Sequence, residues 1–216
     1  MPSRLVCAFS LSLVFFASAR AEPPAEAPKG APTLEQLLVA FKASPGLEAR
    51  FTEKRVMALL AAPLTSEGVL YFSPPGLLAR HVTKPTVSFQ VIEPHRVRFG
   101  DNSKIETIDL AQRPQVKSFV ETFVSILAGD KAALERSYEV RFAALPEGRW
   151  RLTLVPRLAP VDKVIATVTL EGQGIVVSQM RLLEVEGDET LTTFTQVDAA
   201  RRFTEAELDR AFLRKP

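Results

Sequence analysis

Cysteine and histidine are scarce in this chain, and their scarcity argues against several kinds of catalytic site. Cys7 is the only cysteine, and there are two histidines, His81 and His95. Neither histidine belongs to an HExxH motif or to another spacing that is typical of zinc ligands, and the sequence has no GxSxG nucleophile elbow. Residues 172–174 (GQG) lie between two strand patterns and precede no helix, so they predict a hairpin turn and not a phosphate-binding loop. We therefore expect neither enzymatic activity nor a cofactor.

Long apolar runs are also few. The run over residues 5–16 follows Arg4 and precedes the small-x-small sequence Ala19-Arg20-Ala21. This arrangement is typical of a secretory signal peptide, and the run is short for a transmembrane helix. We therefore predict a signal peptide over residues 1–21, with an uncleaved anchor as the alternative. No second run is long enough to span a bilayer.

An excess of one charge is absent once this leader is removed. Arg4 and Arg20 are the only charged residues of the leader, so cleavage leaves 25 Lys and Arg against 25 Asp and Glu. A formal net charge of zero gives no indication of nucleic-acid binding. The mature chain also lacks cysteine, so an ordinary hydrophobic core must stabilise it. We expect a disordered tether rich in proline and alanine over residues 22–32 and a single domain over residues 33–216.

Within this domain the spacing of apolar residues predicts three helices in a chain that is otherwise patterned as strands. The helices span 33–43, 116–128 and 204–213, and Asp130 begins a further helical turn. Thr33 and Gln36 form a capping box. Strands are predicted over 47–59, 65–72, 77–84, 86–91, 97–99, 105–110, 148–155, 163–171, 175–185 and 190–197. Short turns between consecutive strands indicate antiparallel pairing, so we expect an α+β fold with one large, curved antiparallel sheet and helices on one side of it.

Phenylalanine is common, with 14 residues, while the chain has two tyrosines and one tryptophan. Two interpretations of these apolar side chains remain open. For each residue taken singly, a place in an ordinary hydrophobic core is favoured. Taken together, they are also consistent with a strongly curved sheet that leaves an apolar cavity beneath its helices. Such a cavity binds acyl chains by burial, at about 0.8 kcal/mol per CH₂ group.

A succession of short motifs runs from residue 34 to residue 197. It comprises Phe51-Thr52-Glu53-Lys54, Gly68-x-Leu70, Pro75-x-Leu77-Leu78-x-Arg80, Pro85, Leu127-x-Gly129-Asp130, Trp150-x-Leu152-x-Leu154-x-Pro156, Gly187-Asp188-x-Thr190 and Phe194. In this order the motifs resemble the outer-membrane lipoprotein carrier (LolA-like) family of Gram-negative periplasms. The specificity lies in the succession and not in any single motif.

The resemblance implies an unclosed half-barrel, a single curved antiparallel sheet covered by a few helices, whose apolar concave face holds acyl chains. It implies a monomeric periplasmic carrier without a cofactor, with an acylated cargo (a lipoprotein or glycolipid), an inner-membrane donor transporter and an outer-membrane acceptor as partners. The residues expected to line the cavity are Phe51, Leu70, Phe72, Leu78, Phe89, Val91, Phe119, Phe123, Trp150, Leu152, Val168, Met180 and Phe194.

One departure from the family concerns the gate of the cavity. Family carriers place an arginine just before the proline of the hairpin over residues 68–85, where this chain has Pro74. We therefore expect another residue, Arg80, to supply the gating contact. The departure also indicates a divergent member, whose cargo is a glycolipid or another lipid-linked product and not the general lipoprotein pool.

Two alternatives from other functional classes accompany this hypothesis. The first is a non-enzymatic interaction module of an envelope assembly, with a filled core and a sheet edge or the tether as its binding surface. The second is a hydrolase that uses Asp101 or Asp109 with His81 or His95, which no nucleophile motif supports. The acidic turn with Glu184, Glu186, Asp188 and Glu189 is expected to be a solvated loop and not a calcium site, because the EF-hand spacing is missing.

Overall fold

The computed structural model describes residues 31–101 and 103–213, apart from the side chains of seven α2 residues (114–116, 118, 119, 122 and 123). The predicted signal peptide and residues 22–30 of the predicted tether lie outside the described residues. Within the described part of the chain, no helix is both long enough and apolar enough to span a membrane.

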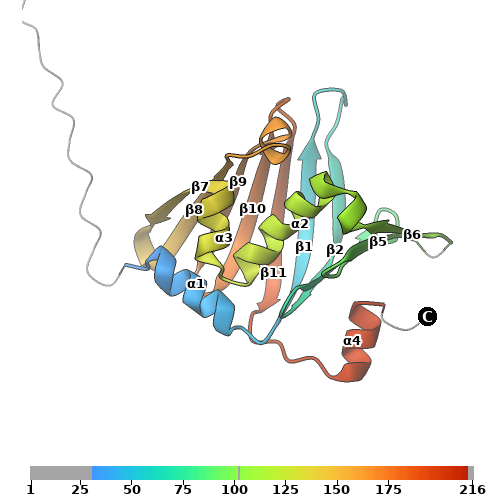
Figure 1. Ribbon diagram of the computed structural model, residues 1–216, viewed down its shortest axis with the longest axis horizontal. Coiled ribbons are helices and arrows are strands. Elements are labelled where there is room, and N and C mark those ends of the chain that lie inside the picture. The colour runs from blue at the N-terminus through green and yellow to red at the C-terminus, as the bar shows by residue number, and fades with distance from the viewer. Residues whose placement is uncertain (1–30, 102, 214–216) are drawn as a thin grey trace, which may run out of the picture.

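Eleven strands of the described chain form one antiparallel sheet (Figure 1). They are β1 (Leu47–Val56), β2 (Leu64–Ser73), β3 (Leu77–Lys84), β4 (Ser88–Ile92), β5 (Arg96–Gly100), β6 (Ile105–Asp109), β7 (Tyr138–Ala144), β8 (Arg149–Pro156), β9 (Ile165–Gln173), β10 (Val176–Glu184) and β11 (Glu189–Asp198). Their order is β6-β5-β4-β3-β2-β1-β11-β10-β9-β8-β7. Two meanders therefore meet where β1 pairs with β11. Because β6 and β7 are the two edges, the sheet does not close into a barrel, which confirms the expected fold class.

Three α-helices cross the concave face of this sheet (Figure 1). They are α1 (Leu34–Ala43), α2 (Pro114–Leu127) and α3 (Lys131–Ser137). The predicted capping box of α1 is present, with Thr33 and Gln36 exchanging hydrogen bonds between side chain and backbone. Three short 3₁₀ helices complete the connections: η1 (Leu110–Gln112), η2 (Pro146–Gly148) and η3 (Val161–Lys163).

The C-terminal helix α4 (Glu205–Ala211) lies on the other face of the sheet, so the prediction that all helices share one side is wrong. On β3 and β4, alternate side chains point to opposite faces. Ala79 and Val91 point outward and are fully buried in a cluster with Ala211 and Phe212. The physical reason is that both faces of β3 and β4 carry apolar side chains. The outer face therefore needs a cover of its own.

The strand β7 was not predicted, although its sequence YEVRFAA alternates. Tyr138 is buried, and Val140 and Phe142 pack against the main core, while Glu139 and Arg141 form an exposed ion pair at 2.7 Å. This core lies between α1, α3, Ile126 of α2 and the strands β7 to β10. Phe41 of α1 meets the buried indole of Trp150 edge to face, with ring centroids 6.2 Å apart.

Candidate ligand cavity

A cavity of about 580 Å³ lies between the concave face of the sheet and the C-terminal end of α2. This volume falls in the range of roughly 300–1,000 Å³ that is usual for ligand sites. Most of its lining side chains are apolar, and the sheet contributes them from β1, β2, β3, β4, β9, β10 and β11. Ile126 and Leu127 of α2 close it from the opposite side. A hydrophobic core and an apolar cavity therefore share the concave face, and they have five buried residues in common: Ile126, Ile165, Leu170, Val177 and Leu182.

The lining changes from apolar to charged along β1. Leu47, Ala49 and Phe51 point into the cavity, and Glu53 and Arg55 follow on the same face two and four residues later. Strand alternation places all five on one side of the sheet. The cavity thus has an apolar end near α1 and a charged end near the β1–β2 hairpin.

Phe51 forms the middle of the apolar floor because its neighbour on β2 is a glycine. Gly68 pairs with Phe51, and a Cβ atom added to Gly68 would lie 2.7 Å from the Phe51 ring and 2.0 Å from the His81 carbonyl oxygen. On the other side Phe51 pairs with Phe194 of β11. The absence of a side chain at Gly68 therefore leaves room for the Phe51 ring.

Arg80 crosses this floor and forms an ion pair inside the cavity. Its Nη2 donates to Glu53 Oε1 at 2.8 Å and to Ser66 Oγ at 3.2 Å, and its guanidinium carbon lies 4.5 Å from the centre of the Phe51 ring. Thr192 Oγ1 donates to the second oxygen of Glu53 at 3.3 Å. Both charged side chains are about three-quarters buried, at 25% and 23% exposure. The pair thus divides the apolar floor from the charged end.

The charged end is built from Arg55 and the acidic turn after β10. Arg55 Nη2 lies 2.9 Å from Glu184 Oε1 and 3.8 Å from Asp188 Oδ2, and the Ala58 amide donates to Asp188 Oδ1 at 3.1 Å. Two carboxylates of the turn expected to be a solvated loop therefore hold the β1–β2 hairpin in place. Among the described residues, no group of three or more His, Cys, Asp or Glu side chains is arranged to hold a metal ion.

The structure distributes the predicted cavity residues over three places. Those that line the cavity are Phe51, Leu70, Leu78, Met180 and Phe194, together with Arg80. Those buried elsewhere on the concave side are Phe72, Trp150, Leu152 and Val168, the last three in the core beneath α1 and α3. Phe89 and Val91 lie on the outer face beneath α4. The side chains of Phe119 and Phe123 lie outside the described residues. A binding role for any of these residues stays a prediction.

Several lining residues were not predicted. On the apolar side they include Ile92, Ile126, Val177 and Leu182, and on the polar side Glu53, Gln90, Arg55 and Thr192. Strand alternation carried the necessary signal for some of them. Leu182 stands two residues after Met180 on β10, as Glu53 does after Phe51 on β1, so each pair shares a face. The predicted lining contains only apolar residues, so it does not include the polar ones.

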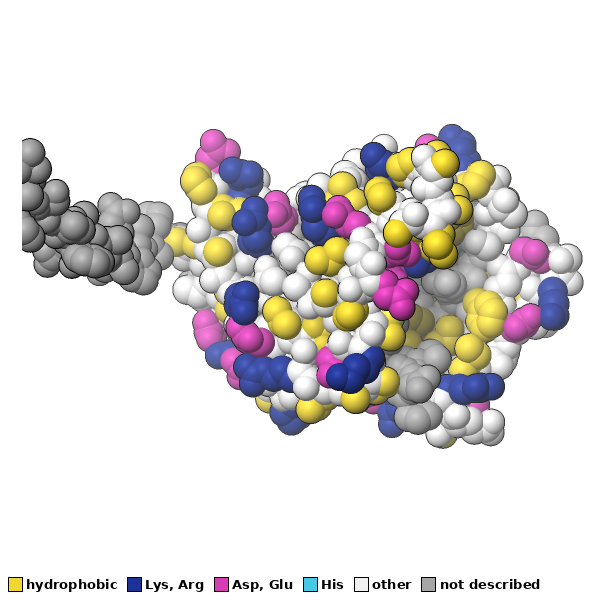
Figure 2. Space-filling model, turned by 90° about the horizontal axis from the view of Figure 1, so that it is seen from above, with side chains coloured by type: hydrophobic (Ala, Val, Ile, Leu, Met, Phe, Trp, Pro, Cys, Tyr) yellow, Lys and Arg dark blue, Asp and Glu magenta, His cyan; other side chains and the backbone are white. Residues whose placement is uncertain are grey.

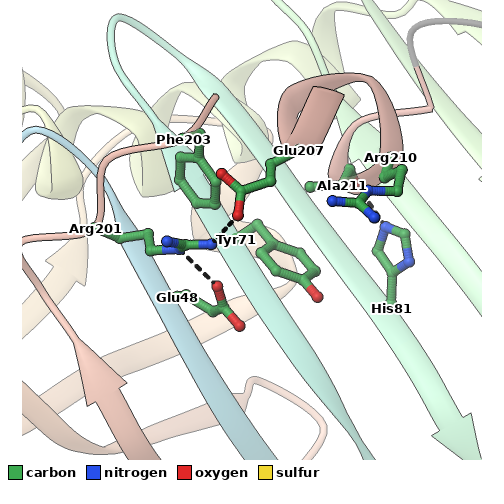
Figure 3. Close-up of a pocket in the computed structure, with 8 residues that line it drawn as sticks. All are labelled: Glu48, Tyr71, His81, Arg201, Phe203, Glu207, Arg210 and Ala211. Atoms are coloured by element: carbon green, nitrogen blue, oxygen red, sulfur yellow. Dashed lines mark hydrogen bonds and ion pairs between the residues drawn. The ribbon is translucent and has the colours of Figure 1, made fainter. Parts of the chain in front are cut away.

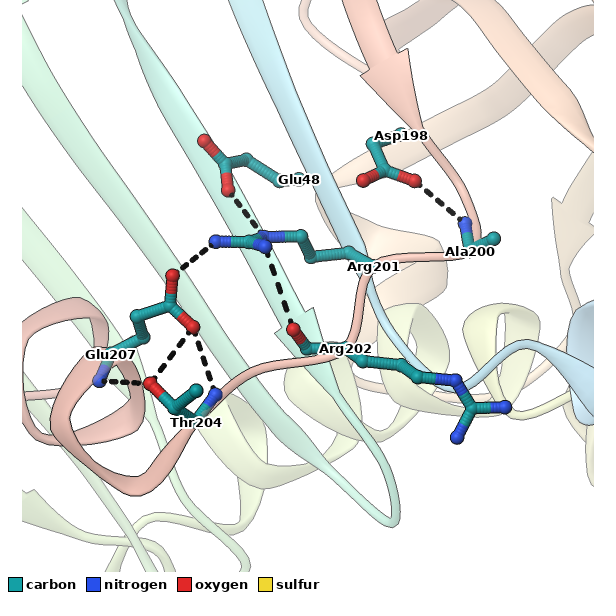
Figure 4. A network of polar contacts seen from close by, with 7 residues as sticks. All are labelled: Glu48, Asp198, Ala200, Arg201, Arg202, Thr204 and Glu207. Carbon is teal, nitrogen blue, oxygen red and sulfur yellow. Dashed lines mark hydrogen bonds and ion pairs between the residues drawn. The ribbon is translucent and has the colours of Figure 1, made fainter.

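A second, smaller cavity of about 290 Å³ lies on the outer face beside α4 (Figure 3). Part of its polar lining is paired, since Arg201 donates to Glu48 at 2.9 Å and to Glu207 at 2.6 Å (Figure 4). Glu207 also accepts from the Thr204 amide, and the hydrogen bonds from Thr204 and Arg201 lower the pKa of Glu207 to about 2. Burial is the largest influence on Tyr71 and raises its pKa.

The end of α4 is held on the outer face by two basic side chains. His81 Nε2 lies 2.7 Å from the Ala211 carbonyl oxygen. Arg98 donates to the carbonyl oxygens of Phe212 and Leu213 at 2.6 and 2.7 Å. These contacts satisfy carbonyl groups that a helix C-terminus otherwise leaves without partners. His81, one of the residues of the hydrolase hypothesis, is thus engaged in anchoring α4.

Comparison with known proteins finds a matching family model. The model of a family described as "Outer membrane lipoprotein carrier protein LolA-like" matches residues 26–212. A search among curated proteins finds no match to the sequence.

Solved structures match this chain at low sequence identity. The LolA superfamily protein NE2245 from Nitrosomonas europaea is 9% identical with a TM-score of 0.45, over 82% of this chain and 97% of that chain. MucB in its complex with MucA from Pseudomonas aeruginosa is 16% identical with a TM-score of 0.46. That similarity covers 81% of this chain and 58% of the other.

Proposed function

Because the chain belongs to the LolA-like family of outer membrane lipoprotein carriers, we propose that it is a carrier for the acyl chains of a lipidated cargo. The cargo is a lipoprotein or a glycolipid, taken up at the inner membrane and released at the outer membrane. The protein acts in the periplasm, which it reaches through the predicted signal peptide of residues 1–21. An inner-membrane donor and an outer-membrane acceptor complete the route.

The observation that carries this proposal is the polarity of the larger cavity along its length. Leu47, Ala49 and Phe51 offer apolar surface at one end, and the ion pairs of Arg80 and Arg55 stand at the other. A lipidated molecule has the same polarity, with an apolar tail and a polar linkage. Burial of the tail supplies about 0.8 kcal/mol per CH₂ group without requiring directed contacts.

The experiment that tests the proposal is native mass spectrometry of the mature protein purified from periplasm, followed by extraction and analysis of the lipid. We expect one acylated species per chain. The stripped protein should then take up a fluorescent fatty acyl probe, and Met180→Glu, which sets a carboxylate in the cavity, should lower the affinity at least about tenfold.

Val39→Glu is the matched control, because Val39 lies on the exposed side of α1 and is 67% exposed. It should bind the probe as the wild type does. An empty protein that refuses the probe would contradict the carrier function. Equal uptake by Met180→Glu would show that the acyl chain binds somewhere other than this cavity.

The second candidate function is an interaction module of an envelope assembly. The specific observation that favours it is the pair of free sheet edges, since β6 and β7 each have one neighbour in the described chain. An open edge is able to pair with an extended segment of a partner. A protein that melts cooperatively but takes up no acyl probe would support this function, and crosslinking would then identify the partner.

A further inference from the structure

The tip of the β1–β2 hairpin is apolar and exposed to solvent. Leu59 is 92% exposed, and Val56, Leu60 and Leu64 are between 43% and 54% exposed. No charged side chain occurs between Arg55 and Glu67. The hairpin ends at the top of the sheet in Figure 1, beside the turn between β10 and β11. Four large apolar side chains are thus displayed together in a loop, where charged and polar residues are usual.

Two further exposed valines adjoin this loop. The Ala58 amide donates to Asp188 in the turn after β10 at 3.1 Å, and in the same turn the Val185 amide donates to the Val164 carbonyl oxygen at 2.9 Å. Val164 and Val185 are 55% and 54% exposed. We call the resulting set, Val56, Leu59, Leu60, Leu64, Val164 and Val185, the tip surface. Seen from the end to which the hairpin points, hydrophobic side chains gather there on a projecting part of the molecule (Figure 2).

The tip surface lies beside the charged end of the larger cavity. Val164 belongs to both, and Arg55, which lines the cavity, directly precedes Val56 in β1. An acyl chain that leaves the cavity at this end therefore meets the tip surface first. An exposed apolar patch is costly to keep in water, and a large one usually marks a site of contact.

We propose that the tip surface docks the protein on a lipid bilayer, with Leu59 and Leu60 entering the boundary between head groups and acyl chains. This docking rests on the proposed carrier function, because its purpose would be to bring the charged end of the larger cavity to the membrane. It is nevertheless measured without any cargo.

A lipid surface suits the tip surface better than a protein groove for two reasons. Burial in a bilayer requires no complementary shape. The tip also lies beside the charged end of a cavity that is otherwise mostly apolar. The turn beside it is acidic and holds Glu186, so electrostatic attraction to anionic lipids is not expected. We therefore expect apolar insertion, which neutral lipids support and added salt leaves unchanged.

The test is flotation of the lipid-free mature protein with phosphatidylcholine vesicles. The wild type should float with the vesicles at low and at high salt. Leu59→Glu combined with Leu60→Glu should weaken the partition at least about tenfold, which corresponds to about 1.4 kcal/mol. Val39→Glu, an equally drastic change on exposed α1, should float as the wild type does.

Two results would overturn the docking proposal: a wild type that does not float, and a double variant that floats unchanged. Flotation that requires anionic phosphatidylglycerol would also overturn apolar insertion. The acyl-probe assay separates this proposal from the proposed function, because the double variant alters the tip and not the cavity floor. The double variant should take up the acyl probe as the wild type does. If the carrier function is wrong and the docking proposal is right, the wild type should refuse the probe and still float.

Discussion

The ion pair between Arg80 and Glu53 lies inside the larger cavity, and its contribution to stability is open to measurement by mutation. Each side chain is about a quarter exposed, which places the pair between two regimes. Fully exposed pairs contribute about 0.2–1 kcal/mol, whereas removal of one partner from a buried pair costs about 3–5 kcal/mol. We expect a coupling free energy of about 1 kcal/mol between Arg80 and Glu53.

A double-mutant cycle of Arg80→Met, Glu53→Gln and their combination measures this coupling by urea unfolding. Arg80→Met should cost about 2 kcal/mol, because it also removes the cation from the face of the Phe51 ring, a contact of about 0.5–2 kcal/mol. Glu53→Gln should cost less, since its amide oxygen is still able to accept from Thr192. The double variant should be less destabilised than the sum of the single ones.

The exposed pair of Lys84 and Glu67 is the matched control for this cycle. This pair joins β3 to β2, as the contact of Arg80 with Ser66 does. Lys84 Nζ lies 3.0 Å from Glu67 Oε2, and the two side chains are 71% and 47% exposed. Its coupling should stay below about 0.5 kcal/mol. If the costs at Arg80 and Glu53 add to within about 0.3 kcal/mol, the pair is not coupled as the structure implies.

The same variants test the proposed gating role of Arg80. Arg80 lies over the floor of the cavity, so a bound chain has to pass its side chain or displace it. Arg80→Met should then release a fluorescent acyl probe about fivefold faster in stopped-flow measurements, since 1 kcal/mol corresponds to about that factor. A release rate equal to that of the wild type would leave Arg80 with a structural role only.

Two further predictions concern the anchoring of α4. Phe212 is fully buried, so Phe212→Ala should destabilise the protein by about 3–5 kcal/mol in urea unfolding, and an unchanged midpoint would mean that α4 does not pack as described. Folding lowers the pKa of Glu207 from its ordinary value of 4.5 to about 2. The ionised carboxylate therefore stabilises the folded state fully at pH values above 4.5, and this stabilisation is lost as the pH falls toward 2. Glu207→Gln should therefore be less stable than the wild type at pH 7 and equally stable near pH 2, while Glu186→Gln should follow the wild type at both.

The fold was largely predictable because local signals and tertiary packing agree along most of the chain. The hairpin of β2 and β3 was expected at 65–72 and 77–84, within one residue of its observed bounds. Gly129, at φ 63°, ends the segment after α2 as a left-handed residue. The missed strand β7 follows α3 directly, and its short alternation has no turn residue before it to mark its start.

The cavity was harder to predict because strand alternation assigns side chains to two faces without saying what covers each face. Phe89 and Phe51 have the same chemistry and both occur in alternating strands. Phe51 lines the cavity, whereas Phe89 packs beneath α4. The difference is decided by α4, which reaches β3 and β4 only after the chain has built the whole second meander. Such a long-range contact leaves no trace in the spacing of residues around Phe89.

The polar side chains of the cavity were also hard to predict, because their partners are distant in the sequence. In the sequence, Glu53 stands in a motif of the family, and Glu184 and Asp188 stand in a turn that is predicted to be solvated. In the folded chain Glu53 pairs with Arg80, 27 residues away, and Glu184 pairs with Arg55, 129 residues away. Both pairs exist because β1 joins the two meanders and so stands between β2 and β11. The central position of β1 therefore determines both the charged end of the cavity and the placement of the apolar hairpin tip beside it.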